Sequence, residues 1–424
     1  MKININKKPY ILNNKDFRTI QIQVMFPIKI KKENLAYNSV LPNMLKFMNN
    51  KYPSEDKFLL AKKKLYILHT NCDYYRSGLN GFFVFNMIVP DTDSLKEDLL
   101  EKQFSLFREM IYNPLVNNNC FNLFELEKEK KNILFDIDNS LKNIGKYQNI
   151  RLREIIDKDN IFSLNLARNT HLIEKVTTSN LYNYYKKIII DNSPIIFVMG
   201  NVDENKINKL CNKYLYKNFN DKVIDIDSDY FMNIRNEVLE VTEDSSFNNS
   251  CLSVVYKLKD ATKEDYIYLN YVRDILTSIS SGLLSKTLRE DLAIVYSVNV
   301  IPYSQYGLLE IKAFLKESNM EIAKNKIIEI IDSLKKSDVF KDKIKNLVDR
   351  ERNAVIKKKD DKFLIFDDFI YYTLGIDDTL EEYYEKYKNI SCEEISSFVS
   401  RLVLDTIYFL KEKNHEKYRN NYFR

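Results

Sequence analysis

Two segments of the sequence match each other at a constant spacing, one in each half of the chain. Residues 175–191 align with residues 389–405 at an offset of 214, and both run from an amphipathic helical pattern into an apolar strand pattern. A second helical pair aligns Leu126 with Leu347 at an offset of 221. Any two amphipathic helices align somewhere, but the shared order of helix and strand at nearly equal offsets favours an internal duplication.

The duplication predicts two domains of similar size. The chain has 424 residues, a length that suits two globular domains. A polar stretch over residues 218–249 lies between the two copies. We therefore predict an α+β fold with domains at residues 1–222 and 223–424.

Strand and helix patterns alternate in both halves. Only seven glycines and eight prolines occur, with no proline after Pro302, and this favours long helices. Strands are predicted where β-branched and aromatic residues alternate or cluster, over residues 17–26, 81–89, 194–199, 252–256, 296–301, 308–314 and 406–410. Helices are predicted where apolar residues recur every three or four positions, over residues 95–112, 121–141, 322–334 and 339–359.

Composition excludes several classes of protein. Against 65 Lys and Arg stand 60 Asp and Glu, and a net charge of +5 does not indicate nucleic-acid binding. The five cysteines are widely spaced without a CxxC pair, which indicates neither a disulfide framework nor a zinc ribbon. No signal-peptide pattern opens the sequence and no run approaches the ~18 apolar residues of a transmembrane helix. We therefore expect a cytoplasmic protein without a membrane span.

Histidine is scarce, and this restricts the chemistry further. The three histidines, His69, His171 and His415, are far apart in the sequence. A zinc site of the HxxEH type or a Ser/His/Asp triad would have to draw on these scattered residues. We expect each of them to be a structural or surface residue.

The strongest local signal for function lies at residues 281–298, which read SGLLSKTLREDLAIVYSV. The pattern predicts a helix that ends in a charged turn and leads into a strand, with Arg289 near the helix C-terminus and Tyr296 at the strand start. A guanidinium and a phenol brought together there could hold a peptide carbonyl or a carboxylate. The alternative is that Arg289 forms only a surface ion pair with a nearby acid.

These residues resemble the motif SSRLFQ-x-LRE-x-x-GLAYSV of the M16 (pitrilysin-like) peptidases. The spacing of seven between Arg289 and Tyr296 is kept, whereas Leu283, Ala293 and Val295 replace the Arg, Gly and Ala of the family. Further landmarks resemble the family in the same order, at residues 113–116, 126–134, 174–185 and 197–202. The resemblance implies two duplicated domains of the LuxS/MPP-like metallohydrolase type, each a mainly antiparallel sheet with helices on one face. It also implies that Arg289 and Tyr296 contact the substrate backbone.

The same resemblance implies that the zinc site is missing. Active members carry HxxEH on a helix of the first domain, where two histidines bind zinc and the glutamate is the general base. The corresponding residues 39–43 are Ser-Val-Leu-Pro-Asn, and no histidine lies between residues 1 and 68. Asp136 occupies the place of a later carboxylate ligand, but one carboxylate alone cannot retain catalytic zinc. We therefore expect no catalytic residue, metal ligand or cofactor in this chain, and zinc only in a partner.

In heterodimeric M16 enzymes one subunit carries HxxEH, and the other lacks it but keeps the Arg/Tyr pair. This chain resembles the silent subunit of bacterial two-subunit members, which include proteins associated with elongation factor P modification and peptidases that trim leader peptides. The resemblance implies a zinc-free subunit, not active alone, that joins an active M16 subunit and positions a peptide substrate. The alternative is a peptide-binding or scaffold protein that works without a protease partner.

Overall fold

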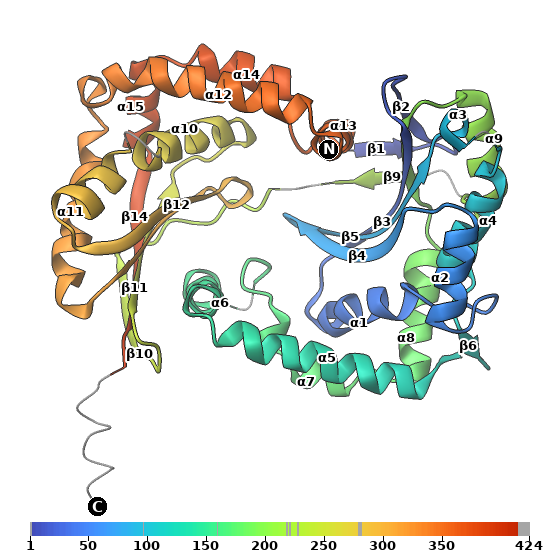
Figure 1. Ribbon diagram of the computed structural model, residues 1–424. Helices are drawn as coiled ribbons and strands as arrows, with labels where there is room; N and C mark the ends of the chain where they lie inside the picture. The colour runs from blue at the N-terminus through green and yellow to red at the C-terminus, as the bar shows by residue number, and fades with distance from the viewer. Residues whose placement is uncertain are drawn as a thin grey trace, which may run out of the picture. The chain divides into compact units, whose positions relative to one another are not determined.

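The computed structural model describes residues 2–95, 97–158, 160–217, 219, 222–226, 229–278 and 282–413. Its tertiary contacts define two compact units. Unit 1 comprises residues 1–140, 164–228 and 369–377, and unit 2 comprises residues 141–163, 229–368 and 378–424. Each unit contains a five-stranded sheet with helices packed against it (Figure 1).

The sheet of unit 1 has the order β2-β8-β3-β5-β4. Only β2 and β8 pair in parallel, and the other neighbours are antiparallel. The strands of the sheet are β2 (Tyr10–Asn13), β3 (Thr19–Lys29), β4 (His69–Ser77), β5 (Asn80–Pro90) and β8 (Ile195–Gly200). Two short pairs accompany it, β1 (Lys2–Ile5) with β9 (Lys222–Asp225) and β6 (Val116–Asn117) with β7 (Cys120–Phe121).

Helices cover one face of this sheet because alternate strand residues there are apolar. Ile20, Ile22 and Val24 of β3 point into the core of unit 1, where residues of α1, α4 and α8 meet them. The α-helices are α1 (Leu35–Leu45), α2 (Glu55–Lys64), α3 (Thr92–Leu95), α4 (Leu100–Tyr112), α5 (Leu123–Leu141), α7 (His171–Glu174), α8 (Thr178–Tyr185) and α9 (Glu204–Tyr214). Short 3-10 helices η1 (Lys32–Asn34) and η2 (Leu166–Arg168) and a π-helix η3 (Lys186–Ile190) complete the unit.

The sheet of unit 2 has the order β10-β14-β11-β13-β12, with one parallel pair, β10 and β14. Its strands are β10 (Leu239–Asp244), β11 (Ser250–Leu258), β12 (Val295–Tyr303), β13 (Leu308–Leu315) and β14 (Leu402–Lys411). In each sheet, the first strand along the chain lies at one edge and pairs in parallel with the last strand along the chain, and the other three strands follow in the same order in both sheets. The topology therefore confirms the predicted duplication. All seven predicted strands are present within a few residues of their predicted bounds.

Helices pack on both faces of the sheet in unit 2. On one face, Leu252, Val254 and Tyr256 of β11 join a core with α10 and α11. The α-helices are α6 (Ile144–Ile156), α10 (Tyr266–Thr277), α11 (Met320–Ser333), α12 (Ile344–Lys359), α14 (Leu380–Lys388) and α15 (Cys392–Ser400). The shorter helices are η4 (Lys263–Asp265), η5 (Ser285–Asp291), η6 (Ser304–Tyr306), η7 (Glu317–Asn319), η8 (Ser337–Val339) and η9 (Lys341–Lys343).

The second face of this sheet is covered by α6, a helix that comes from the first half of the chain. Leu152 and Ile156 of α6 pack against Val255, Tyr408 and Leu410. The helix is also held by polar contacts, because Gln148 donates a hydrogen bond to Ser253, whose hydroxyl donates to Glu310 at 2.6 Å. The predicted architecture placed helices on one face only, and α6 adds a layer to it.

In return, a segment from the second half of the chain belongs to unit 1. Helix α13 (Lys362–Thr373) starts in unit 2, and residues 369–377 belong to unit 1, where the Phe369 ring meets that of Phe197 edge-on. At the offset of 221 found in the sequence, Ile144 at the start of α6 corresponds to Ile365 of α13. Equivalent helices are therefore exchanged, and the single predicted boundary at 222/223 does not describe this exchange. Across the described residues, no helix is both long and apolar enough to cross a membrane.

Candidate functional site

The predicted helix, turn and strand are present over residues 282–298, the described part of the motif, and the helix is unusual. Residues 285–291 form the π-helix η5, with Arg289 in its last turn. π-Helices are rare and occur frequently at functional sites. The helix is reached through Gly282, where an added Cβ would lie 2.6 Å from the backbone nitrogen of Ser278. Only glycine fits at this close approach.

The turn after η5 holds a residue in a strained conformation. Ala293 has φ of 51°, in the left-handed region that glycine adopts freely and alanine only at a cost in free energy. It replaces the glycine of the M16 motif. On each side of Ala293 a backbone N–H bonds back to η5, from Leu292 to the Thr287 carbonyl at 3.0 Å and from Ile294 to the Leu288 carbonyl at 3.0 Å. These bonds keep the turn tight in spite of the strain.

Tyr296 lies at a bulge in the strand that follows. Val295 is paired with Leu315 and Ser297 with Phe314, so Tyr296 has no counterpart in the register of β13. A bulge leaves its extra residue unpaired and re-aims its side chain. The Tyr296 side chain is 50% exposed. A π-helix, a left-handed alanine and a bulge therefore fall within twelve residues.

Arg289 and Tyr296 are both presented to solvent. Arg289 is exposed, and neither side chain has a hydrogen bond or ion pair with any residue that the structure describes. Arg289 therefore does not form the surface ion pair considered as the alternative with any described residue. The guanidinium and the phenol both retain their hydrogen-bonding capacity for a ligand.

The strand that carries Tyr296 is an open edge of its sheet. β12 is the last strand in the order, and its nine residues include no charged side chain. The opposite edge, β10, has three carboxylates in six residues, a usual protection against pairing with another chain. Backbone groups of β12 that face away from β13 make no hydrogen bond with a described residue. This edge can pair with an extended peptide backbone.

The position of the M16 zinc motif does not fit a metal ion. Residues 39–43 lie in α1, where Val40 and Leu41 are fully buried and Pro42 occupies the helix interior. The Ser39 hydroxyl donates to the Leu35 carbonyl at 3.2 Å. Asp136 is an exposed residue of α5. Among the described residues, no three His, Cys, Asp or Glu side chains come together as metal ligands.

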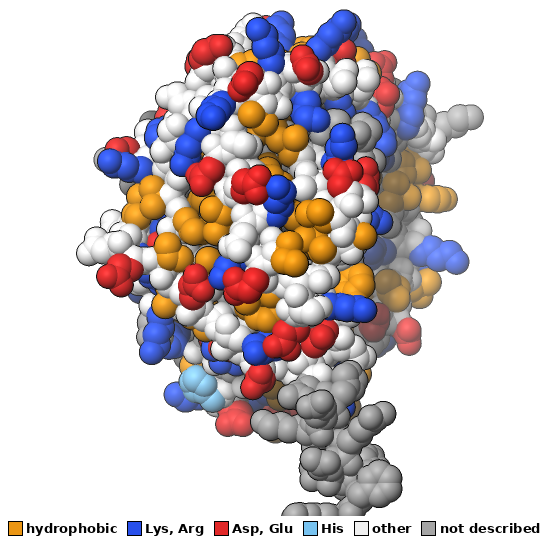
Figure 2. All heavy atoms as spheres, turned by 90° about the vertical axis from the view of Figure 1, so that its left-hand side faces the viewer, with side chains coloured by type: hydrophobic (Ala, Val, Ile, Leu, Met, Phe, Trp, Pro, Cys, Tyr) orange, Lys and Arg blue, Asp and Glu red, His pale blue; other side chains and the backbone are white. Residues whose placement is uncertain are grey.

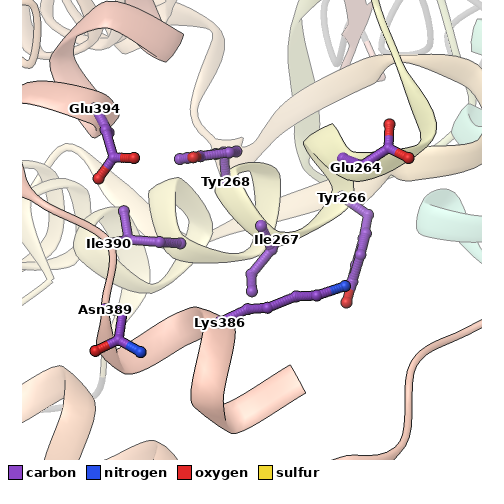
Figure 3. A pocket seen from close by; sticks show the side chains of 8 residues that line it. All are labelled: Glu264, Tyr266, Ile267, Tyr268, Lys386, Asn389, Ile390 and Glu394. Atoms are coloured by element: carbon purple, nitrogen blue, oxygen red, sulfur yellow. The ribbon is translucent and has the colours of Figure 1, made fainter. Parts of the chain in front are cut away.

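The remaining histidines and a surface pocket beside α10 offer no better site. His69 is largely exposed at the start of β4, where partial burial of its ring lowers the pKa of the imidazole and the nearby Lys62 lowers that pKa further. His171 begins the short helix α7, and His415 lies outside the described residues. A pocket of about 280 Å³ lies beside α10 (Figure 3). Two of its charged groups are already engaged, because Lys386 is paired with Asp378 and Glu394 accepts from the backbone of its own helix cap.

Surface charge is mixed on the face that Figure 2 shows. Basic and acidic side chains alternate there, with small apolar areas between them. No large area of one sign is visible on that face among the described residues. The face shown in Figure 2 therefore carries no electrostatic footprint for nucleic acid.

Comparison with known proteins supports the resemblance to the M16 peptidases. Residues 175–350, which include the Arg289–Tyr296 turn, match the sequence model of the Peptidase M16 inactive domain. The probable inactive metalloprotease YmfF of Bacillus subtilis (strain 168) is 21% identical over 407 residues, covering 95% of each chain. Over residues 175–350 the chain is therefore similar to the inactive domain of the M16 peptidases, and over nearly its whole length it is similar to a relative named as a probable inactive metalloprotease.

Solved structures agree with this fold. A conserved protein from Enterococcus faecalis V583 superposes with a TM-score of 0.86 at 17% identity, covering 97% of this chain and 99% of that one. A peptidase M16 inactive domain from Pseudomonas fluorescens superposes with a TM-score of 0.68 at 12% identity, covering 98% of both. The expected fold of two duplicated M16-type domains is confirmed.

Proposed function

We propose that this chain is the non-catalytic subunit of a heterodimeric M16 metallopeptidase. It encloses and positions a peptide substrate, such as a leader or precursor peptide, which an HxxEH-bearing partner cleaves. One observation carries the proposal. Arg289 and Tyr296, on a strained turn, have no partner among the residues that the structure describes, while α1 lacks the residues that would bind zinc.

The chemistry of the turn suits a peptide main chain. An arginine fork donates to a carbonyl or a carboxylate, and a tyrosine hydroxyl can donate to a second oxygen. The open edge of β12 continues from Tyr296 and offers N–H and C=O groups to an extended segment. These groups recognise backbone rather than side chains, as a subunit that handles a whole precursor peptide requires.

The zinc ion and the chemical step belong to the partner in this proposal. No step is assigned to this chain beyond binding and orientation of the peptide. We place the complex in the cytoplasm, and cell fractionation tests that placement.

The test is made on the complex from the native host. The tagged chain is co-purified, the partner is identified by mass spectrometry, and cleavage of fluorescein-labelled casein by the pair is measured. Arg289→Ala is expected to lower kcat/KM about 10- to 100-fold, the usual effect of losing a hydrogen bond from a charged donor. Lys286→Ala, an exposed cation of the same π-helix, is the matched control and should leave cleavage unchanged.

Two results would contradict the proposal. If Arg289→Ala and Tyr296→Phe both cleave at the native rate, the turn does not position substrate. If no peptidase co-purifies and the chain still binds casein in an Arg289-dependent manner, it is a peptide-binding protein without a protease partner.

A further inference from the structure

Asn319 holds the turn that presents Arg289 and Tyr296. Its side-chain Nδ2 donates to the Ile294 carbonyl at 3.0 Å, across 25 residues of sequence. The N–H of Ile294 donates to the Leu288 carbonyl of η5. The peptide groups of Ile294 are therefore fixed on one side by the helix that carries Arg289 and on the other by Asn319.

Asn319 can make this contact because its own helix does not use its side chain. It is the last residue of η7 and directly precedes α11, and its backbone is helical, with φ of −97° and ψ of −1°, whereas a capping asparagine is usually extended. The side chain makes no capping hydrogen bond. Instead, the Ser318 hydroxyl donates to Oδ1 of Asn319 at 3.4 Å, which orients the amide so that Nδ2 points at Ile294.

The support behind Asn319 is rigid. It follows β13 by four residues and begins α11, whose Ala323 and Ile327 are fully buried in the core of unit 2. Ile294 immediately precedes the bulged part of β12, and Ala293 before it is strained. A strained turn persists only where its surroundings over-determine it.

We propose that Asn319 is a positioning residue, which sets the orientation of Tyr296 relative to Arg289 through the Ile294 carbonyl. The inference rests on the proposed function for its consequence in peptide binding, but its structural part can be measured separately.

The key variant is Asn319→Asp. Aspartate has the same shape, and the Asn319 side chain makes no capping hydrogen bond that the exchange would remove, so α11 keeps its start. It offers an oxygen where the Ile294 carbonyl requires a donor, so the contact becomes repulsive. Asn353→Asp, on the exposed face of α12, is the matched control for the added charge.

A local probe is available because the chain contains no tryptophan. Tyr296→Trp introduces a single indole at the bulge, whose fluorescence anisotropy reports the order of the turn. In this background Asn319→Asp is expected to lower the anisotropy, with the midpoint of urea unfolding unchanged, whereas Asn353→Asp changes neither. With Tyr296 intact, Asn319→Asp should raise the KM of the co-purified pair for labelled casein about 3- to 10-fold at constant kcat.

The outcomes separate the two ideas. Unchanged anisotropy and unchanged KM overturn the inference. Lowered anisotropy together with normal cleavage by Arg289→Ala leaves the positioning role in place and rejects the proposed function. Should Asn319→Asp fail to fold, Ser318→Ala removes the orienting hydroxyl and should lower the anisotropy by a smaller amount. An unchanged anisotropy in Ser318→Ala would then overturn the inference.

Discussion

Ala293 is the residue at which the turn stores strain. A left-handed conformation costs an L-residue roughly 1–2 kcal/mol because its Cβ crowds the following carbonyl. The M16 motif has glycine here, and this chain has alanine at φ of 51°. The strain is tolerated because the neighbouring N–H groups of Leu292 and Ile294 are bonded to η5.

Ala293→Gly is therefore expected to stabilise the protein by about 1 kcal/mol, as measured by urea unfolding. Ala354→Gly, in the interior of α12, is the control because the same exchange costs about 1 kcal/mol in a helix. Effects of equal sign at the two positions would show that the conformation of Ala293 is not strained.

Glu351 is a second residue out of its usual environment. It is buried on α12, facing Arg350 and Lys358 of its own helix and Arg273 and Asp274 of α10. Burial raises the pKa of the Glu351 carboxyl above its usual value. Asp274 beside it is already satisfied, because Tyr387 and Arg350 donate to it at 3.0 and 2.9 Å.

A raised carboxyl pKa means that the folded state holds the proton more tightly than the unfolded chain. The contribution of Glu351 to the free energy of unfolding is therefore greatest below about pH 4.5 and is lost as the pH rises through the folded-state pKa. Glu351→Gln should be more stable than the native chain at pH 7 to 8, with the difference vanishing near pH 4, in denaturant titrations across pH. The hydrogen bond from the Ser391 backbone N–H lowers the pKa of the Glu394 carboxyl. Glu394→Gln should therefore be less stable than the native chain at neutral pH, which is the opposite of the effect expected for Glu351→Gln.

Helix α6 shows how an element can be fixed by polar contacts. Arg235 donates to the Ile155 and Ile156 carbonyls at the C-terminal end of α6, at 2.7 and 3.0 Å. The same guanidinium pairs with the fully buried carboxylate of Asp405 at 2.9 Å, which Lys257 also contacts. One side chain therefore joins the end of the helix to the sheet.

Arg235→Ala is expected to destabilise the protein by about 2–4 kcal/mol, because it leaves a buried carboxylate with one partner fewer and two carbonyls unpaired. Amide hydrogen exchange in α6 should accelerate at the same time. Arg352→Ala, at an exposed position of α12, should stay within about 0.5 kcal/mol of the native value. Equal effects of the two substitutions would rule out this role for Arg235.

The elements that the sequence predicts well are those with strong periodicity. Strands such as β5 and β11 and the helices α5, α11 and α12 follow their apolar patterns. Strand β4 was not predicted because its residues HTNCDYYRS are largely polar, and β10 because half of its residues are acidic. Helix α4 begins at Leu100 rather than residue 95, since residues 92–95 form a helix of their own.

The candidate site was predicted only in part. Arg289 and Tyr296 are recognisable from their spacing, but the π-helix and the bulge depend on tertiary hydrogen bonds that no local pattern encodes. Asn319 precedes a helix and would be read as an ordinary N-cap. The exchange of α6 and α13 could not be predicted either, because an amphipathic pattern indicates which face is buried and not which sheet buries it.

At the scale of the whole molecule, the exchange predicts how fragments behave. A fragment of residues 229–413 lacks α6, so Val255, Leu308, Tyr408 and Leu410 lose their cover. We expect it to aggregate and to lack a cooperative unfolding transition. Joining residues 141–163 to its N-terminus through a flexible linker should restore both solubility and cooperativity.

The matched control for this fragment carries Leu152→Asp and Ile156→Asp in the added helix, which removes its apolar contacts. Cooperative unfolding of the fragment without residues 141–163 would show that unit 2 does not need α6.

The exchanged helix also sets the order of events during synthesis. Residues 144–156 leave the ribosome long before β14, the strand that carries Tyr408 and Leu410. At ordinary elongation rates this interval lasts on the order of 10–50 s. Unit 1 is likewise incomplete until residues 369–377 have been synthesised. The nascent chain therefore carries an unplaced amphipathic helix for most of translation, and this is the interval in which a chaperone would be needed.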